Sequence, residues 1–361
     1  MNKDIEKFFL AANSCEGFVS EFDSAFRDGS GKAFIVKGGP GTGKSSFLRY
    51  IATECIKKDI KVILCPCSSD PDSLDAVILP EYNISLLDGT APHVVEPKYP
   101  GACEELVDTG VFWDSAALFK EKEEIINLTK KNKAFHQNAA SYLVAAGEVL
   151  NDTLKISSLA LKVNKCERFC ENICKEFLRG KLGFGKETVR FLSGVTPKGV
   201  ITYRKSLDNF FDKAIIIDDK YHTAASFILE YVKRYALING YDVITLKNAF
   251  LPSKIIDHII IPEIDFCICT EHKFCHFERN VRRIHARRFY ENSVFSKNKT
   301  RITLNRRIFS ELAESACQSL LKAKSVHDNL EKIYINTMDF SSHNAFCKTF
   351  FTEKLLPLIR N

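Results

Sequence analysis

Residues 38–46 read Gly38-Gly39-Pro40-Gly41-Thr42-Gly43-Lys44-Ser45-Ser46, and the first eight fit the P-loop pattern G-x-x-x-x-G-K-[ST] at every fixed position. An apolar run at residues 33–36 leads into this stretch and an amphipathic run follows it, which is the strand–loop–helix context that the motif requires. The glycines allow backbone N–H groups to face phosphate oxygens, and the start of the helix adds the positive end of its dipole. We therefore predict that these nine residues bind ATP, with Lys44 on the β- and γ-phosphates and Ser45 on Mg²⁺.

Outward from this stretch, strand and helix patterns alternate, which is typical of an α/β fold with a parallel sheet. After the P-loop helix, we expect a buried strand at residues 61–65 and another at residues 84–89. Residues 5–28 are expected to contain a short helix, and residues 68–81 a loop. Farther along, apolar residues recur at a spacing of three to four, so about residues 113–178 are predicted to be helical.

The strand at residues 84–89 supplies the preferred acidic ligand of Mg²⁺, because it ends in Asp88 and is expected to lie beside the P-loop. Asp70, Asp72 and Asp75 are alternatives, since a carboxylate after the preceding strand could act as a base toward a phosphoryl acceptor. Asp75 recurs later in the chain as Asp257, in a unit without a phosphate cradle. This recurrence favours a structural role for Asp75.

The chain repeats itself at an offset of 181 to 182 residues. Residues 32–36 recur at 213–217, and Phe9-Leu10 recurs as Phe191-Leu192. We predict a tandem duplication of a P-loop NTPase-like parallel-sheet domain, in which each copy is followed by a helical segment.

The boundaries of the two units follow from this repeat. The first unit covers residues 1–180, with its helical segment at about 113–178. The second covers residues 188–361, with its helical segment at about 303–358. The glycine-rich residues 180–185 are the expected linker between them.

The second unit lacks the phosphate cradle. Its aligned positions are Asp219, Lys220, Tyr221, His222, Thr223, Ala224, Ala225 and Ser226. Every glycine is replaced, Ala225 stands where Lys44 does in the first unit, and Asp219 adds a charge that repels phosphate. We therefore predict one ATP site per chain, in the first unit.

Length and composition limit the classes of protein to which the chain can belong. The chain has 361 residues, 45% of them hydrophobic, which is sufficient for two buried cores. Residues 1–7 contain no apolar run of the kind that signal peptides have, and no apolar run in the chain approaches 18 residues. We expect a cytoplasmic protein with no membrane partner.

Thirteen cysteines are present, and this odd number in a large chain argues against a disulfide framework. Most are expected to be small buried apolar residues. Cys267, Cys269 and Cys275 lie close in sequence to His272 and His276, so this group could bind zinc. Its spacing does not match the usual paired C-x₂₋₄-C pattern, which favours packing over metal binding.

Positive charge is concentrated in the second half of the chain. Residues 1–180 have a net charge of −4, and residues 181–361 have a net charge of +10. Within the segment from Arg279 to Arg307, ten basic residues accompany a single acidic residue, Glu291. This segment could bind an acidic partner or nucleic acid, or it could be a solvated basic surface.

Three stretches together resemble a family of little-characterised bacterial duplicated P-loop ATPases. They are residues 37–46, Cys67-Ser68-Ser69-Asp70-Pro71-Asp72-Ser73-Leu74-Asp75 and Leu87-Asp88-Gly89-Thr90-Ala91-Pro92-His93. The resemblance spans nearly the full length and implies nucleotide binding and a duplicated fold, but no pathway. It also implies a second P-loop, which this chain has lost.

Three functions are compatible with these patterns. The first is a Mg²⁺-dependent ATPase or ATP-driven switch with Lys44 and Asp88 as catalytic residues. Its water-activating base is not identified, because Gly89 follows Asp88, and the candidates are His93, Glu96 and Asp70. The second is a kinase of a small molecule or nucleotide, with Asp70 or Asp72 as the base. The third is an ATP-sensing regulator that binds nucleic acid through basic residues with adjacent aromatics, namely Arg282, Arg283, Arg287, Arg288, Phe289 and Tyr290.

Overall fold

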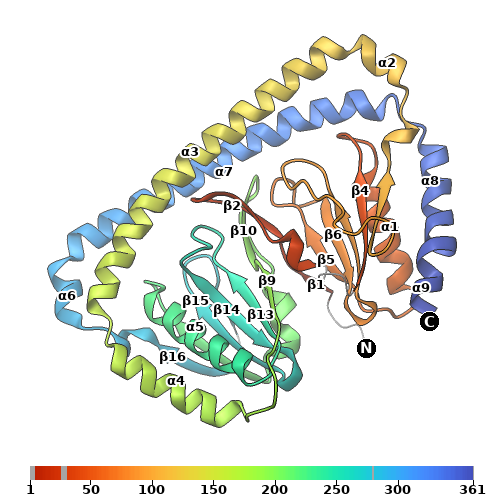
Figure 1. Cartoon of the computed structure of the whole chain (residues 1–361). Helices are drawn as coiled ribbons and strands as arrows, with labels where there is room; N and C mark the ends of the chain where they lie inside the picture. Colours follow the sequence, from red (N-terminus) through yellow and green to blue (C-terminus); the bar gives the residue numbers. More distant parts are fainter. Residues whose placement is uncertain (1–4, 26–30, 279, 361) are drawn as a thin grey trace.

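The computed structural model describes residues 5–25, 31–278 and 280–360 and has an α/β fold with two six-stranded sheets (Figure 1). The first sheet, in the order β1-β5-β6-β7-β4-β8, consists of β1 (Glu6–Lys7), β5 (Ile63–Pro66), β6 (Leu74–Leu79), β7 (Ile84–Asp88), β4 (Lys32–Lys37) and β8 (Glu104–Asp108). The second, in the order β9-β13-β14-β15-β12-β16, consists of β9 (Glu187–Arg190), β13 (Val243–Lys247), β14 (Ile256–Ile261), β15 (Phe266–Glu271), β12 (Lys213–Asp218) and β16 (Arg282–His285). The α/β class is confirmed, and the matching strand orders fit a duplicated domain.

Both sheets are mixed rather than parallel. β6 pairs antiparallel with β5 and β7, and β14 pairs antiparallel with β13 and β15, whereas the other neighbouring strands are parallel. The predictions of a purely parallel sheet and of a loop over residues 68–81 are therefore wrong. All six residues of β6 are buried. Such a strand has no alternation of apolar and polar residues, so the sequence pattern did not identify it.

The N-terminal segment forms a β-hairpin that the sequence did not predict, and the short helix expected there is a 3₁₀-helix. β2 (Ala11–Ser14) pairs with β3 (Gly17–Ser20), and a 3₁₀-helix (Phe22–Ala25) follows; residues 26–28 of this segment lie outside the described residues. The second unit repeats the hairpin with β10 (Ser193–Thr196) and β11 (Gly199–Thr202). Gly17 and Gly199 have φ values of 95° and 96°, which a side chain would strain, and this explains why a glycine follows each two-residue turn.

The two hairpins meet at equivalent residues of the repeat. Phe9 and Phe191 exchange two backbone hydrogen bonds, both of 2.9 Å. A contact in which each copy presents the same residue to the other is the signature of an isologous interface, as in a two-fold dimer. The two units are therefore arranged like the subunits of a dimer within one chain.

Two long helices connect the units. The first helical region comprises α2 (Ser115–Lys120), α3 (Lys122–Ala160) and α4 (Val163–Phe177); the second comprises α6 (Asn292–Lys297), α7 (Lys299–Ile335), α8 (Phe340–Thr349), a π-helical turn (Phe350–Leu355) and α9 (Leu356–Arg360). Figure 1 shows α3 and α7 side by side, spanning both sheets. They run antiparallel, because Trp113 bridges to Met338 at one end and Leu161 bridges to Tyr290 at the other.

The terminal helices are exchanged between the units. α1 (Lys44–Ile56) and α5 (Thr223–Ile238) each cover the sheet of their own repeat. By contrast, α4 packs on the second sheet, where Cys166, Cys170 and Ile173 join its core. In return, α8 and α9 pack on the first sheet, with the Phe350 ring 5.0 Å from that of Phe34. The boundaries at residues 180 and 188 thus divide the sequence repeats. They do not divide the packed units, because the helices at the end of each repeat pack on the sheet of the other repeat.

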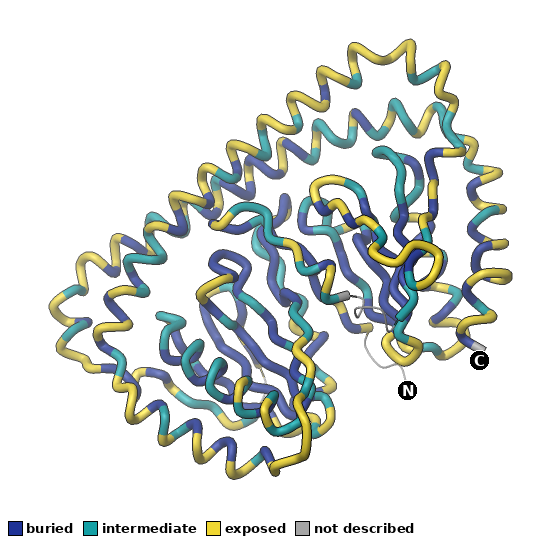
Figure 2. Tube along the Cα trace, viewed as in Figure 1, coloured by how far each residue is buried: buried dark blue, intermediate teal, exposed yellow. Residues whose placement is uncertain are grey.

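The faces of the sheets that lack helices share one core. In β4, Ala33 and Ile35 belong to an apolar cluster that also contains residues of the second sheet, including Ile216 of β12. The alternate residues Phe34 and Val36 point to the helices instead. Figure 2 shows the central strands of both sheets mostly buried, whereas the edge strands β8, β9 and β16 include exposed residues. All thirteen cysteines are free, as expected. Among the described residues, no helix is long and apolar enough to cross a membrane.

Candidate functional site

The glycine loop, residues 38–43, lies between the end of β4 and the start of α1. This is the edge of the sheet at which its parallel strands end, where ligands bind in open α/β folds. A cavity of about 1100 Å³ opens there and is lined by the loop, by the ends of β6 and β7, and by α3 and α7. Of the nine residues predicted to bind ATP, all except Gly39 line it: Gly38, Pro40, Gly41, Thr42, Gly43, Lys44, Ser45 and Ser46.

Close contacts exclude a side chain at two positions of the loop, Gly38 and Gly43. A Cβ atom on Gly38 would lie 2.3 Å from Thr109 Oγ1, and one on Gly43 would lie 2.7 Å from His343 Nε2. Gly43 also has a φ of 82°, which side chains rarely adopt. The buried Thr42 fixes the loop, because its hydroxyl hydrogen-bonds to Gly39 O at 2.8 Å and lies 3.0 Å from Thr109 Oγ1.

Lys44 and Asp88 come together at the mouth of the cavity. Lys44 Nζ donates hydrogen bonds to the carbonyl oxygens of Gly38 (3.0 Å) and Gly39 (2.8 Å) and lies 3.8 Å from Asp88 Oδ2. The other carboxylate oxygen of Asp88 accepts hydrogen bonds from the backbone and the hydroxyl of Thr90. β7, which ends in Asp88, pairs directly with β4, and this pairing brings the acid to the loop.

The alternative carboxylates differ in their positions. Asp72 is exposed, does not line the cavity and pairs with Lys198 at 2.6 Å, which lowers its pKa. Asp70 lines the cavity, with Lys324 Nζ of α7 3.3 Å from Oδ2. Asp75 also lines it and is buried, because the antiparallel β6 begins at the edge where the parallel strands end. Burial and the nearby Asp88 raise the pKa of Asp75 to about 8, so this group carries a proton at neutral pH.

Two of the three candidates for positioning water lie in the cavity. His93 is buried against the Phe22 ring at 4.4 Å, and its Nε2 is 3.8 Å from Asp75 Oδ1. Burial lowers the pKa of His93, which makes it a neutral imidazole. Asp70 is the second. Glu96 instead pairs with Lys37 at 2.6 Å outside the cavity lining.

Residues of α7 face the glycine loop, and the sequence did not predict them. The Glu331 carboxylate lies near the backbone N–H of Gly41. His327, whose Nε2 is 3.5 Å from Glu331 Oε1, and this amide together lower the pKa of Glu331. The Tyr334 ring packs beside Gly39 and against Trp113 at 5.9 Å. These contacts join positions about 290 residues apart, so no local pattern in the sequence could have indicated them.

In the second unit, side-chain oxygens accept hydrogen bonds from the backbone N–H groups that correspond to those of the phosphate cradle. The carboxylate of Asp219 accepts hydrogen bonds from the backbone N–H groups of Tyr221 and Ala225, both at 3.0 Å, and from the Tyr290 hydroxyl. Tyr290 Oη in turn accepts the N–H of Ala224 at 2.7 Å. An internal carboxylate thus fills the role that a phosphate has in a functional cradle.

The basic segment is largely paired within the chain. Arg282 contacts Glu176 at 2.8 Å, Arg283 pairs with Glu271, and Arg287 contacts Asn292 at 2.7 Å. Arg288 lies over the Phe289 ring at 5.6 Å. Arg279 lies outside the described residues. These partners favour a structural use of the segment over binding to nucleic acid.

The five residues considered for zinc do not converge. Cys267 hydrogen-bonds to Phe210 O, Cys269 lies 3.8 Å from Cys267, and His276 pairs with Glu271. His272 instead faces Asp257.

Comparison with known proteins finds no family model, no curated protein and no solved structure that matches the chain significantly. The resemblance to duplicated P-loop ATPases therefore stays a prediction.

Proposed function

We propose that the chain binds ATP with Mg²⁺ at the glycine loop and hydrolyses it as an ATP-driven switch. The observation that supports this most is the convergence of the glycine loop, Lys44 and Asp88 on one cavity. In this proposal the loop amides and Lys44 bind the phosphates. Ser45 and Asp88 would hold Mg²⁺, which would neutralise charge on the phosphates.

The contacts of α7 supply the switch. The Glu331 carboxylate lies near the Gly41 N–H, where it would repel a bound phosphate, so nucleotide binding would displace Glu331 from the loop. The same helix extends to the second unit, because α7 spans both sheets. Nucleotide binding at the first unit would therefore change the contacts of α7, and α7 also reaches the second unit. A ligand must interact differently with two states to cause a conformational response, and this change of contacts would meet that requirement.

A kinase is the second candidate, and the extent of the cavity favours it. Beyond the glycine loop the lining continues along α3 through Asn132, Lys133, His136 and Gln137. Such polar groups could hold an acceptor, and Asp70 lies in the same cavity to act as a base. No comparable observation favours the nucleic-acid-binding regulator, since the arginines have partners within the chain.

The test compares Lys44→Ala with Lys57→Ala, a matched change just beyond the other end of α1, where the side chain is exposed. Titration with a fluorescent ATP analogue should show that affinity falls at least tenfold in Lys44→Ala and is unchanged in the control, because the lysine provides a point charge for phosphate. Equal affinity in both variants would contradict the proposal. Free phosphate and phosphorylated product, measured after incubation with ATP and a metabolite mixture, distinguish hydrolysis from transfer.

A further inference from the structure

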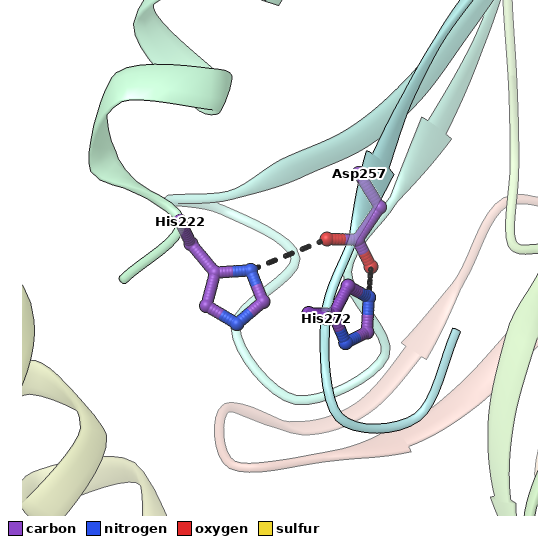
Figure 3. Close-up of side chains that lie close together, drawn as sticks. All are labelled: His222, Asp257 and His272. Atoms are coloured by element: carbon purple, nitrogen blue, oxygen red, sulfur yellow. Dashed lines mark ion pairs between the residues drawn. The ribbon is translucent and has the colours of Figure 1, made fainter. Parts of the chain in front are cut away.

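A second cluster of polar side chains lies at the corresponding edge of the second sheet (Figure 3). His222 precedes α5, Asp257 lies near the start of the antiparallel β14, and His272 follows β15. Figure 3 shows both imidazole rings directed at the one carboxylate. One nitrogen of each ring and the carboxylate oxygen all lie within 4.8 Å of one another. Of these three residues only His272 was considered above as a metal ligand, together with the nearby cysteines, and the proposed function uses none of them.

The distances in this cluster are those of metal ligands rather than of hydrogen bonds. His222 Nδ1 is 3.6 Å from Asp257 Oδ1, and His272 Nε2 is 3.5 Å from Asp257 Oδ2. Charge-assisted hydrogen bonds between such groups are about 2.7–2.9 Å long. Two ligand atoms bound at about 2.0–2.2 Å to one tetrahedral Zn²⁺ lie about 3.4 Å apart.

The two nitrogens that face the carboxylate are within ion-pair distance of it but make no hydrogen bond to any described residue. His222 Nδ1 and His272 Nε2 are buried and have no hydrogen bond within the described part of the chain. The side chain of His272 is 5% exposed, and that of Asp257 is 2% exposed. Buried imidazole nitrogens without hydrogen bonds are costly, so they indicate a missing ligand.

The surroundings hold the carboxylate in place for such a ligand. The side-chain amide of Asn248 donates hydrogen bonds to Asp257 Oδ2 (2.9 Å) and Oδ1 (3.1 Å). Metal-binding carboxylates are commonly oriented by a hydrogen-bond donor of this kind. His272 Nδ1 accepts a long hydrogen bond of 3.4 Å from the backbone N–H of Phe274.

We propose that His222, Asp257 and His272 bind a divalent transition metal, with Zn²⁺ as the favoured ion. Two imidazole nitrogens and a carboxylate oxygen suit zinc, and three protein ligands leave a further position for water or a small ligand. His222 also lines a separate cavity of about 590 Å³, together with Ser226 and Lys254. The ion would connect the loop before α5 to two strands, at the edge where the first unit has its glycine loop. This proposal does not depend on ATP binding.

The test measures metal in the full chain, purified without an affinity tag. We expect about one zinc per chain by elemental analysis, or uptake of one equivalent of Zn²⁺ after treatment with a chelator. Zinc affinity should fall at least tenfold in His272→Ala and in Asp257→Asn, which keeps the shape of the side chain. The control is His276→Ala, whose side chain is 70% exposed and should bind zinc as the wild type does.

A second measurement covers the case in which these variants fail to fold. Co²⁺ bound to the wild-type chain should give the visible absorption of a four-coordinate site, and Zn²⁺ should remove it by competition. Wild-type protein that takes up neither ion stoichiometrically would overturn the proposal and leave a metal-free His–Asp–His cluster. Unchanged zinc affinity in both folded variants would overturn it as well.

Discussion

Asp219 accepts the hydrogen bonds that a phosphate would accept in a functional cradle. We therefore expect the variant Asp219→Ala to lose much of its stability. This side chain is 1% exposed and accepts hydrogen bonds from two backbone N–H groups and from the Tyr290 hydroxyl. Alanine removes all three acceptor contacts at once. The same residue is aligned with Gly38 of the first unit, so the change also tests why the second unit no longer requires a ligand in its cradle.

The magnitude follows from the donors left without partners. Each buried donor that loses its acceptor costs about 1–3 kcal/mol, and water can reach part of this loop, so we expect a loss of about 2–5 kcal/mol. The unfolding entropy of about 2.1 cal/mol/K per residue gives roughly 0.76 kcal/mol/K for a chain of this length. Because the two sheets share one core, we treat the chain as one cooperative unit. The melting temperature should then fall by about 3–7 °C.

Differential scanning calorimetry on three variants checks this prediction. Asp219→Asn keeps one acceptor oxygen and should lose about half as much stability. Asp218→Ala is the matched control, because the neighbouring carboxylate is partly exposed and, within the described part of the chain, forms an ion pair only with the exposed His285, at 3.1 Å. In all three, calorimetric titration with an ATP analogue should still give one site per chain. A melting temperature of Asp219→Ala within 1 °C of the control would refute the reasoning, and two sites in the wild type would refute the stoichiometry.

Three further predictions concern the first unit. Glu331→Gln should tighten binding of an ATP analogue about fivefold, because it removes a negative charge worth about 1 kcal/mol beside the Gly41 amide; a fluorescence titration that shows equal or weaker binding would count against the switch. Asp88→Asn should reduce Mg²⁺-dependent phosphate release more than Asp75→Asn does, and the reverse order in a phosphate assay would move the metal ligand to Asp75. The raised pKa of Asp75 means that the stability provided by its protonated form is present below about pH 4 and is lost as the pH rises through about 8. Asp75→Asn should therefore flatten the decline of the melting temperature over this range, and an unchanged slope would show that Asp75 does not titrate there.

Features with a local signal in the sequence could be predicted. The glycine loop stands between strand and helix because its motif, its apolar strand and its helix start are contiguous. Asp88 was found because it ends an apolar run. The α/β class and the repeat followed from similar runs at a constant offset.

Features that depend on the path of the chain could not be predicted. The direction of β6 is set by its pairing with β5 and β7, and its uniform burial leaves no pattern that shows it. This direction places Asp75 in the cavity, whereas its recurrence as Asp257 favoured a structural role. The exchange of α4 and α8 gives no sequence signal either. A hint lay only in length, since the 39 residues of α3 extend about 58 Å, farther than one small domain.

The exchange of helices explains why a unit without a cradle can still matter to the proposed switch. The end of α7 lies against the glycine loop of the first unit through Glu331 and Tyr334. The end of α3 lies correspondingly against the second unit, where the Ser157 hydroxyl is 2.5 Å from that of Thr223. Each long helix thus contacts the loop of the other repeat.

In the proposal, only one of these two contacts would respond to nucleotide. At Thr223 the neighbouring amides are already satisfied by Asp219 and Tyr290, so this end of the pair is fixed in either state. At Glu331 the carboxylate lies near the Gly41 amide, where a bound phosphate would repel it, so in the proposal this end would have two arrangements. In the proposal, displacement of Glu331 would free this end of the helix pair while the other end stays held. In the proposal, the second unit therefore holds one end of the α3–α7 pair while the first unit changes its contacts with the other end. This role requires a folded loop in the second unit but no second ATP.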